Sequence, residues 1–232
     1  MKRIIWSVAM IPLIATAMLM QFMPESVPMH FDISGNADRW GSKYELFIVP
    51  AIIIVVILLF SFLIIYFEKK SRNMPDEKER AGAASNAGAL KIIVLCIAVF
   101  FTAVDGFILY NAYSMSKEQA NETVIDTVRI VCILFGVLLI VMANFLPKSR
   151  KNGIMGLRTK WSMYNDNTWR KSNMFGAAVL MLAGALTIIT AAFTAQMVSL
   201  IMMLVFLLSG TAVCIVYSHI VYKNELNKAD KK

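Results

Sequence analysis

The sequence predicts an all-α polytopic membrane protein, a bundle of six transmembrane helices with both termini in the cytoplasm (N-in and C-in). The 232 residues are 58% hydrophobic and only 16% charged, which is more apolar than a soluble core of this length requires. Six apolar stretches each hold about 20 residues or more, enough to cross a hydrocarbon core of about 30 Å. Basic residues gather in alternate connections between these stretches, as in loops that stay in the cytoplasm.

The six stretches follow one another along the whole chain. The first stands directly after Lys2 and Arg3, as the apolar part of a secretory signal would. It is longer than such a segment, and no small-x-small cleavage pattern precedes Pro24, so we expect a retained helix. The three cysteines all lie inside apolar stretches, which favours buried small side chains over a disulfide framework or a metal site. The predicted helices are 4–23, 46–67, 90–112, 124–145, 174–195 and 197–222.

The orientation follows from the distribution of lysine and arginine. With the N-terminus inside, 18 of the 23 basic residues fall in the cytoplasm, and only Arg39, Lys43 and Lys117 fall outside. Because this bias sets the orientation of membrane proteins, the sequence predicts both termini inside and the connection 24–45 outside the cell.

The outer connection carries more charged and aromatic side chains than a simple turn needs. It reads VPMHFDISGNADRWGSK over residues 27–43. We expect a compact loop in which Gly35 and Asn36 form a turn, Trp40 lies at the membrane interface and Asp/Arg pairs close the loop. These expectations suit a structural loop and a peptide-recognition surface equally well.

Two other chemistries fit this loop less well. A zinc site built on His30 and Asp32, even with Asp38 added, has too few donors for an ion that usually takes four. Catalysis by Ser34 or Ser42 would need His30 as a base with its own orienting group, and the sequence offers none.

Two longer connections are predicted on the cytoplasmic side. Residues 68–89 read as a solvated linker, with room for a short helix after Pro75. In residues 144–173, Pro147 is expected to end the fourth helix because proline cannot donate the helical hydrogen bond. Asn165 is a candidate N-cap for a helix that continues into the fifth span.

The second of these segments carries seven basic residues and two tryptophans. Trp161 and Trp169 suit the headgroup zone of a membrane. One interpretation is a basic loop held against anionic lipid. The other is a shaped docking surface, which Gly153 and Gly156 favour because glycines mark specific turns.

Two charged residues interrupt the third and fourth apolar stretches. Asp105 and Arg129 would lie at similar depths in antiparallel neighbouring helices, and an unpaired charge there is expensive. We expect them to form an intramembrane pair. The alternatives are that Arg129 extends outward to the interface or pairs with Asp126 one turn away.

Two segments also carry a resemblance to a known family. The outer segment PESVPMHFDISGNADRWGSK resembles a small N-terminal domain of unknown function in bacterial membrane proteins. The inner segment NFLPKSRKNGIMGLRTKWSMYNDNTWRKSN resembles the SdpI immunity-protein family. Leu157, Ser162 and the run 171–173 depart from the family pattern, which commonly has Ile, Thr and Lys-Thr-His-Arg there. The order of the two motifs and the number of helices agree with the family.

The resemblance implies a non-enzymatic multi-pass protein of the bacterial plasma membrane without a cofactor. It would protect its cell from a secreted SDP-type peptide toxin and could recruit a cytoplasmic transcriptional autorepressor. The chain would divide into a two-helix N-terminal unit (1–67), the linker (68–89) and a four-helix SdpI-like unit (90–232). Toxin sensing would fall to His30, Asp32, Gly35, Asp38, Arg39 and Trp40. The repressor dock would comprise Asn144, Pro147, Lys148, Asn152, Gly156, Arg158, Thr159, Trp161, Asn165 and Trp169.

Two other functions compete with immunity. A transporter or flippase of a peptide or lipid would be expected to show broken helices or inverted repeats with polar residues at the midplane, and neither is clear in the sequence. A membrane enzyme would need paired carboxylates or a metal cluster, and the sequence offers no such group at any one depth. The predicted partners are the lipid bilayer, a toxin and a repressor, without direct nucleic-acid binding.

Overall fold

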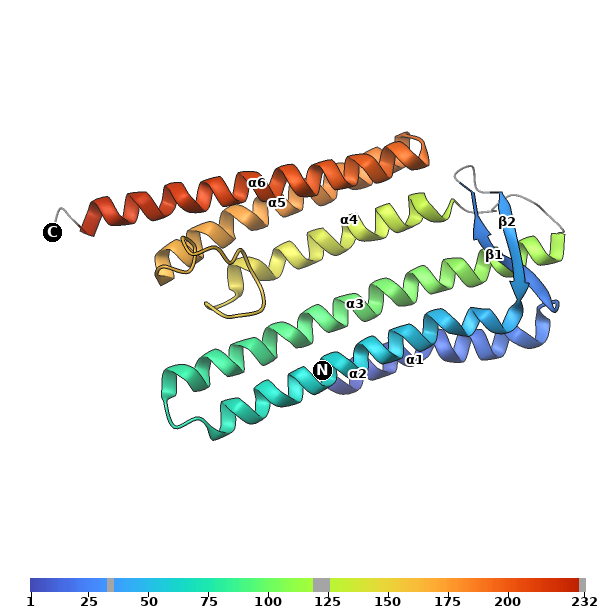
Figure 1. The fold of residues 1–232 in the computed structure, drawn as a ribbon, viewed down its shortest axis with the longest axis horizontal. Helices are drawn as coiled ribbons and strands as arrows, with labels where there is room; N and C mark the ends of the chain where they lie inside the picture. The colour runs from blue at the N-terminus through green and yellow to red at the C-terminus, as the bar shows by residue number, and fades with distance from the viewer. Residues whose placement is uncertain (33–35, 119–125, 230–232) are drawn as a thin grey trace.

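The computed structural model describes residues 1–32, 36–118 and 126–229. Six helices lie side by side along one axis (Figure 1). They are α1 Lys2–Leu19, α2 Ile48–Asn73, α3 Glu77–Glu118, α4 Thr127–Phe145, α5 Asp166–Phe193 and α6 Gln196–Ala229. Each belongs to a segment long and apolar enough to cross a membrane. The prediction of an all-α polytopic bundle of six helices is confirmed.

A β-hairpin at one end of the bundle is the element that the sequence did not predict. Strand β1 Ser26–Phe31 pairs antiparallel with β2 Ala37–Ser42, and Ser26 lies opposite Ser42. A 3-10 turn, Lys43–Phe47, then leads into α2. Ser42 begins this turn because its side chain and that of Glu45 cap each other's backbone N–H groups. We call this end of the bundle the hairpin end and the opposite end the segment end (Figure 1).

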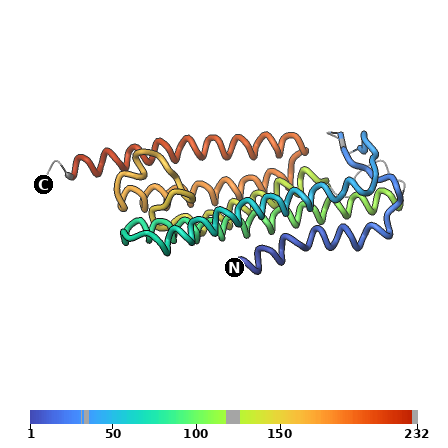
Figure 2. Tube along the Cα trace, turned by 60° about the horizontal axis from the view of Figure 1, so that its bottom comes forward, coloured from blue at the N-terminus to red at the C-terminus, as the bar shows by residue number. Residues whose placement is uncertain are grey.

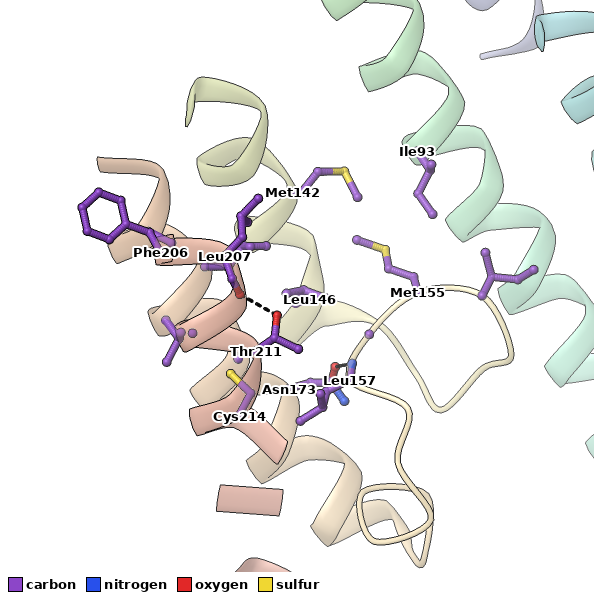
Figure 3. Close-up of a pocket in the computed structure, with 17 residues that line it drawn as sticks. Ile93, Met142, Leu146, Met155, Leu157, Asn173, Phe206, Leu207, Thr211 and Cys214 are labelled. Carbon is purple, nitrogen blue, oxygen red and sulfur yellow. Dashed lines mark hydrogen bonds between the residues drawn. The ribbon is translucent and has the colours of Figure 1, made fainter. Parts of the chain in front are cut away.

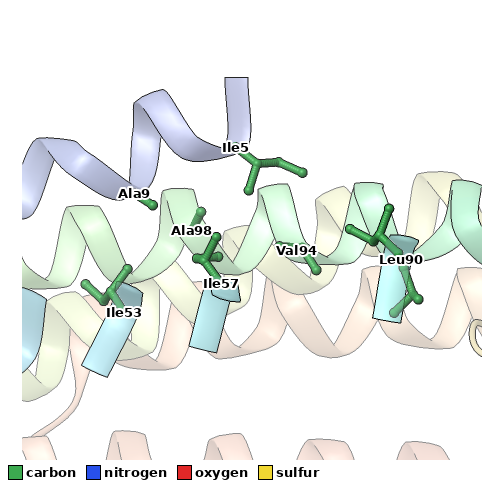
Figure 4. Packing of buried hydrophobic residues seen from close by; sticks show 8 residues of the cluster. Ile5, Ala9, Ile53, Ile57, Leu90, Val94 and Ala98 are labelled. Atoms are coloured by element: carbon green, nitrogen blue, oxygen red, sulfur yellow. The ribbon is translucent and has the colours of Figure 1, made fainter. Parts of the chain in front are cut away.

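The helices form two groups of three. Helices α1, α2 and α3 pack together, as do α4, α5 and α6, and the groups meet mainly where α3 contacts α4. Figure 4 shows the core of the first group, in which small residues such as Ala9 on α1 and Ala98 on α3 let the backbones approach closely. The other labelled members of this core are Ile5, Ile53, Ile57, Leu90 and Val94. Helix α3 thus packs mainly with α1 and α2, and the expected division into an N-terminal unit, a linker and an SdpI-like unit stays a prediction.

Two glycines bring α4 and α5 together in the second group. A Cβ added to Gly136 would lie 2.7 Å from the carbonyl oxygen of Gly184, and one added to Gly184 would lie 2.6 Å from that of Gly136. Any side chain there would force the helix backbones apart. Small residues of this kind typically govern the packing of helices in lipid, where no hydrophobic force drives association.

The predicted linker 68–89 is mostly helical. Helix α2 runs on to Asn73 and α3 begins at Glu77, so only residues 74–76 separate them. Asp76 accepts a hydrogen bond from the backbone N–H of Glu79 at 3.0 Å, which starts the helix expected after Pro75. That helix does not stop before the third span but continues into it, and Ala83, Ala87 and Ala89 are buried along it. The short helix expected after Pro75 is thus the start of α3, and the cytoplasmic placement of residues 68–89 stays a prediction.

Helices of unequal length make the segment end uneven. Figure 2 shows α6 extending past the other helices toward the C-terminus. Near this end, Glu68 of α2 forms ion pairs with Lys2 of α1 and, at 2.7 Å, with Lys91 of α3. These pairs tie the three helices of the first group together where the apolar core ends.

Candidate functional site

Ion pairs hold the hairpin in shape. His30 Nδ1 on β1 lies 2.6 Å from Asp38 Oδ1 on β2, and Arg39 pairs with Glu45 in the following turn. Predicted Asp/Arg pairs within the loop are thus replaced by a His/Asp and an Arg/Glu pair. The side chains of His30, Asp38 and Arg39 are all substantially exposed, so they remain accessible to a partner at the hairpin end.

The tip of the hairpin is closed by a carboxylate. Asp32 accepts hydrogen bonds from the backbone N–H of Asn36 at 2.8 Å and from its side-chain amide at 3.0 Å. Gly35, expected in the turn with Asn36, lies outside the described residues. Trp40 on β2 exposes 43% of its surface, and its place at a membrane interface remains a prediction.

The inner side of the hairpin is anchored on α3. Val27 and Leu46 are buried together with Leu109 and Ala112 of that helix. A Cβ at Gly41 would overlap a carboxylate oxygen of Glu45, so the strand passes close to the capping side chain. The hairpin therefore presents a charged outer surface on an apolar base that is continuous with the helix bundle.

The predicted Asp105–Arg129 pair is absent. Asp105 is buried on the same face of α3 as Ala98 and Leu109, which packs toward α1 and α2 instead of α4. Neither carboxylate oxygen of Asp105 has a hydrogen-bond partner among the described residues. Arg129 instead forms an ion pair with Asp126 at 3.4 Å, the alternative within its own helix, and donates to the carbonyl of Thr194.

Local predictions at the segment end are confirmed. Helix α4 ends at Phe145 and Pro147 lies in a 3-10 turn, Leu146–Lys148. Asn165 caps α5, with its side chain accepting from Thr168 N at 2.8 Å. Thr168 Oγ1 in turn accepts from Asn165 N at 3.0 Å, which completes a reciprocal cap.

Trp169 belongs to the protein interior and not to the headgroup zone. Only 3% of its surface is exposed, and its indole N–H donates to the carbonyl of Ser149 at 3.0 Å. Trp161 packs against His219 of α6, with ring centroids 4.6 Å apart. The expectation of an interfacial Trp169 is wrong because the loop folds back over the start of α5.

Buried amides and hydroxyls shape the loop between α4 and α5. Asn152 is 5% exposed and accepts from the backbone N–H groups of Ile154 and Met155, each at 2.8 Å. The backbone N–H of Gly153, which directly follows Asn152, donates to the side chain of Asn86 of α3 at 2.8 Å. Thr159 lies 3.0 Å from Ser218 of α6, hydroxyl to hydroxyl. The loop is thereby attached to both groups of helices.

Asn173 is a site residue that sequence reasoning missed. Its Oδ1 accepts from the backbone N–H of Leu157 at 2.8 Å, next to Gly156, whose φ of +118° suits glycine. Asn173 lies in the run that departs from the family pattern, and that departure was the only signal. The side chains of the predicted dock thus separate into those that shape the loop and exposed ones. The exposed ones are Asn144, Pro147, Lys148 and Arg158.

The described ranges contain no cluster of side chains suited to bind a metal ion. No group of three His, Cys, Asp or Glu side chains there could hold an ion, and His30 already uses Nδ1 for Asp38. What the described geometry offers is two polar surfaces, one at each end of an apolar bundle.

Comparison with known proteins finds one family match in the N-terminal part of the chain and another in the C-terminal part. A domain of unknown function, DUF1648, matches residues 8–54, which include the greater part of α1, the hairpin and the start of α2. The SdpI/YfhL protein family matches residues 148–218, from the loop through most of α6. The chain is 24% identical to Immunity protein SdpI of Bacillus subtilis (strain 168) over 211 residues, covering 90% of this chain and 91% of that protein. No solved structure matches. The SdpI/YfhL match from the loop through most of α6, together with the similarity to an immunity protein along nine-tenths of the chain, makes this protein similar to that family of membrane proteins.

Proposed function

We propose that this protein is an immunity protein of the bacterial plasma membrane that protects its cell from a secreted membrane-active peptide toxin of the SDP type. The observation that carries the proposal is the similarity to an immunity protein along nine-tenths of both chains. A similarity of that extent includes the hairpin as well as the loop between α4 and α5. The proposed activity is binding and not catalysis.

The proposed orientation puts the hairpin outside the cell and the segment end in the cytoplasm. It rests on the lysine and arginine bias of the sequence. The structure is compatible with this arrangement, because the hairpin and the basic loop lie at opposite ends of the bundle (Figure 1). A toxin arriving from outside would meet the hairpin first.

The hairpin is the proposed toxin-reading surface. It exposes charged groups, Asp38 and Arg39, beside the aromatic ring of Trp40. An exposed ring next to paired charges suits an amphipathic peptide at a membrane surface, where both kinds of contact are available. His30 and Asp32 complete the described part of the proposed surface, and Gly35, which lies outside the described residues, is the remaining predicted toxin-sensing residue.

The loop between α4 and α5 is the proposed dock for a cytoplasmic repressor. Its shape is set by buried hydrogen bonds, and its exposed charges include Lys148 and Arg158. A shaped basic surface suits an acidic patch on a partner protein. For toxin binding to control docking, the toxin must bind one helix arrangement more tightly than another.

Toxin challenge of a sensitive bacterium that expresses this chain tests the proposal. The wild type is expected to protect, and Asp38→Ala with Arg39→Ala is expected to abolish protection. The matched control is Lys78→Ala with Glu79→Ala, which removes the same two charge types from exposed positions at the segment end. Equal membrane levels of all variants are checked by immunoblot.

The outcomes separate protection from signalling. Arg158→Ala is expected to retain protection and to lose toxin-dependent recruitment of a fluorescent repressor to the membrane. If the wild type fails to protect against an SDP-type peptide, the immunity proposal is wrong, and transport of a peptide or lipid becomes the function to test.

A further inference from the structure

Two cavities adjoin the loop between α4 and α5, and their walls include Gly156 and Lys148 of the proposed repressor dock. The first, the apolar cavity, has a volume of about 330 Å³ and lies among α3, α4, α5, α6 and the loop (Figure 3). The second, the basic cavity, has a volume of about 370 Å³ and lies between α3 and the end of α4. Met155 lines both of them.

Most of the described side chains that line the apolar cavity are hydrocarbon, and its amide and hydroxyl side chains are engaged within the protein. Asn173 is engaged with Leu157 N and with the carbonyl of Trp169, and Thr211 donates to the carbonyl of Leu207 in its own helix. Its other walls are side chains such as Met142 and Phe206 (Figure 3). Along α5 it extends from Asn173 to Ala183, a length of about 15 Å at 1.5 Å rise per residue. A long, narrow, apolar space of this kind suits a hydrocarbon chain.

The basic cavity, unlike the apolar cavity, has charged side chains in its wall. Lys148 and Arg150 form part of one wall, and the facing wall is the small-residue surface of α3, including Ala84 and Gly88. No acidic side chain is among the described residues that line it, and neither cation forms an ion pair with any described group. Two exposed cations without an ion-pair partner among the described residues, beside a wall of small uncharged residues, favour an anion of the size of a phosphate.

Met155 joins the two cavities into one path. Its side chain extends from the loop toward Ile93 of α3 and Met142 of α4, at the boundary between the helix groups (Figure 3). Methionine is flexible enough to move aside for a chain that passes it. Its backbone N–H is held by Asn152 at 2.8 Å, so the loop at this point keeps its place.

We propose that the two cavities together bind one anionic phospholipid, with its phosphate between Lys148 and Arg150 and one acyl chain in the apolar cavity. The cations lie at the end of α4 and the hydrocarbon-lined space lies deeper in the bundle. These positions match the headgroup and the acyl chain of a single lipid. A soluble anion would leave the apolar cavity empty, and an uncharged lipid would leave the cations unpaired. The bound lipid fills the boundary between the two helix groups under the loop.

The full chain, purified in mild detergent, is titrated with equal amounts of phosphatidylglycerol and phosphatidylcholine and measured by native mass spectrometry. The wild type is expected to retain phosphatidylglycerol in preference. Lys148→Gln with Arg150→Gln is expected to lower the affinity for phosphatidylglycerol by about tenfold, which is about 1.4 kcal/mol, and to leave phosphatidylcholine binding unchanged. The matched control is Lys69→Gln with Arg72→Gln, two exposed cations at the same end of the bundle that line neither cavity.

A second variant tests the acyl chain by itself. A Cβ at Gly176 would meet nothing closer than Cys214 Sγ at 4.0 Å, so Gly176→Leu has room to enter the apolar cavity. A phosphatidylglycerol with a photoreactive acyl chain is expected to label α6 between Phe206 and Cys214 in the wild type, and this labelling is expected to disappear in Gly176→Leu. Thermal unfolding in detergent checks that each variant is folded.

Three results would overturn the proposal. Equal losses in the control and in the Lys148/Arg150 variant would mean that diffuse surface charge attracts the lipid. Unchanged labelling of α6 in Gly176→Leu would mean that no chain enters the cavity. Equal retention of both lipids by the wild type would mean that the cations select no headgroup.

Discussion

Asn173 of α5 and Leu157 of the preceding loop are joined by a 2.8 Å hydrogen bond from the Leu157 backbone N–H to the Asn173 side-chain oxygen. The same side chain donates to the carbonyl of Trp169 at 2.9 Å. One buried amide thus links the turn at Gly156 to the first turns of α5. The position of the loop over α5 depends on these two hydrogen bonds.

Asn173→Leu is expected to lower the free energy of unfolding by about 1–3 kcal/mol, because the Leu157 N–H loses its partner. Thermal unfolding in detergent measures the loss. Asn144→Ala is the control, since that exposed amide bonds only to Ile140 in its own helix. Equal unfolding temperatures for the wild type and Asn173→Leu would show that the hydrogen bond contributes nothing.

Gly156→Ala is expected to destabilise the loop by about 1–3 kcal/mol. Its φ of +118° disfavours a side chain, and a Cβ would collide with Asn173 and lie 2.9 Å from the Trp169 ring. Gly153→Ala is the matched variant, because its Cβ would meet nothing closer than 3.6 Å. Limited proteolysis of the loop reports the difference, and faster cleavage of Gly153→Ala than of Gly156→Ala would contradict the prediction.

Gly136→Ala is expected to weaken the packing of α4 on α5 and to lower the unfolding temperature clearly. The added methyl group would meet a backbone carbonyl at 2.7 Å, which cannot rotate away as a side chain can. Gly106→Ala places the same group on α3 with nothing within 4 Å, so it is expected to be neutral or slightly stabilising. A larger effect at Gly106 than at Gly136 would refute the proposed close contact.

Asp105→Asn is expected to raise the unfolding temperature at alkaline pH. An ionised carboxylate without hydrogen-bond donors is costly in a buried position, and the amide removes that charge at nearly constant volume. The contrasting variant is Asp126→Asn, which keeps an acceptor for Arg129 N but removes the ion pair with its guanidinium and is therefore expected to lower the unfolding temperature. Destabilisation by Asp105→Asn would indicate that the carboxylate has a stabilising role that these contacts do not reveal.

The sequence by itself determined the elements whose causes are local. Six apolar runs of sufficient length must be helical in lipid. A single segment there can satisfy the hydrogen-bonding groups of its own backbone only as a helix. Pro147 ends α4 and Asn165 begins α5 through interactions within one turn of the chain. These features need no knowledge of which helices are neighbours.

Only the tertiary structure decided which residues meet. The hairpin pairs Ser26 with Ser42, Trp169 reaches Ser149, and Arg129 turns to Asp126 and Thr194 instead of Asp105. Asp105 and Arg129 lie at similar depths in the sequence, but depth does not reveal the face of the helix on which each residue lies. That face is set by close contacts such as Gly136 with Gly184, where the absence of a side chain on each helix matters only because the other helix is there.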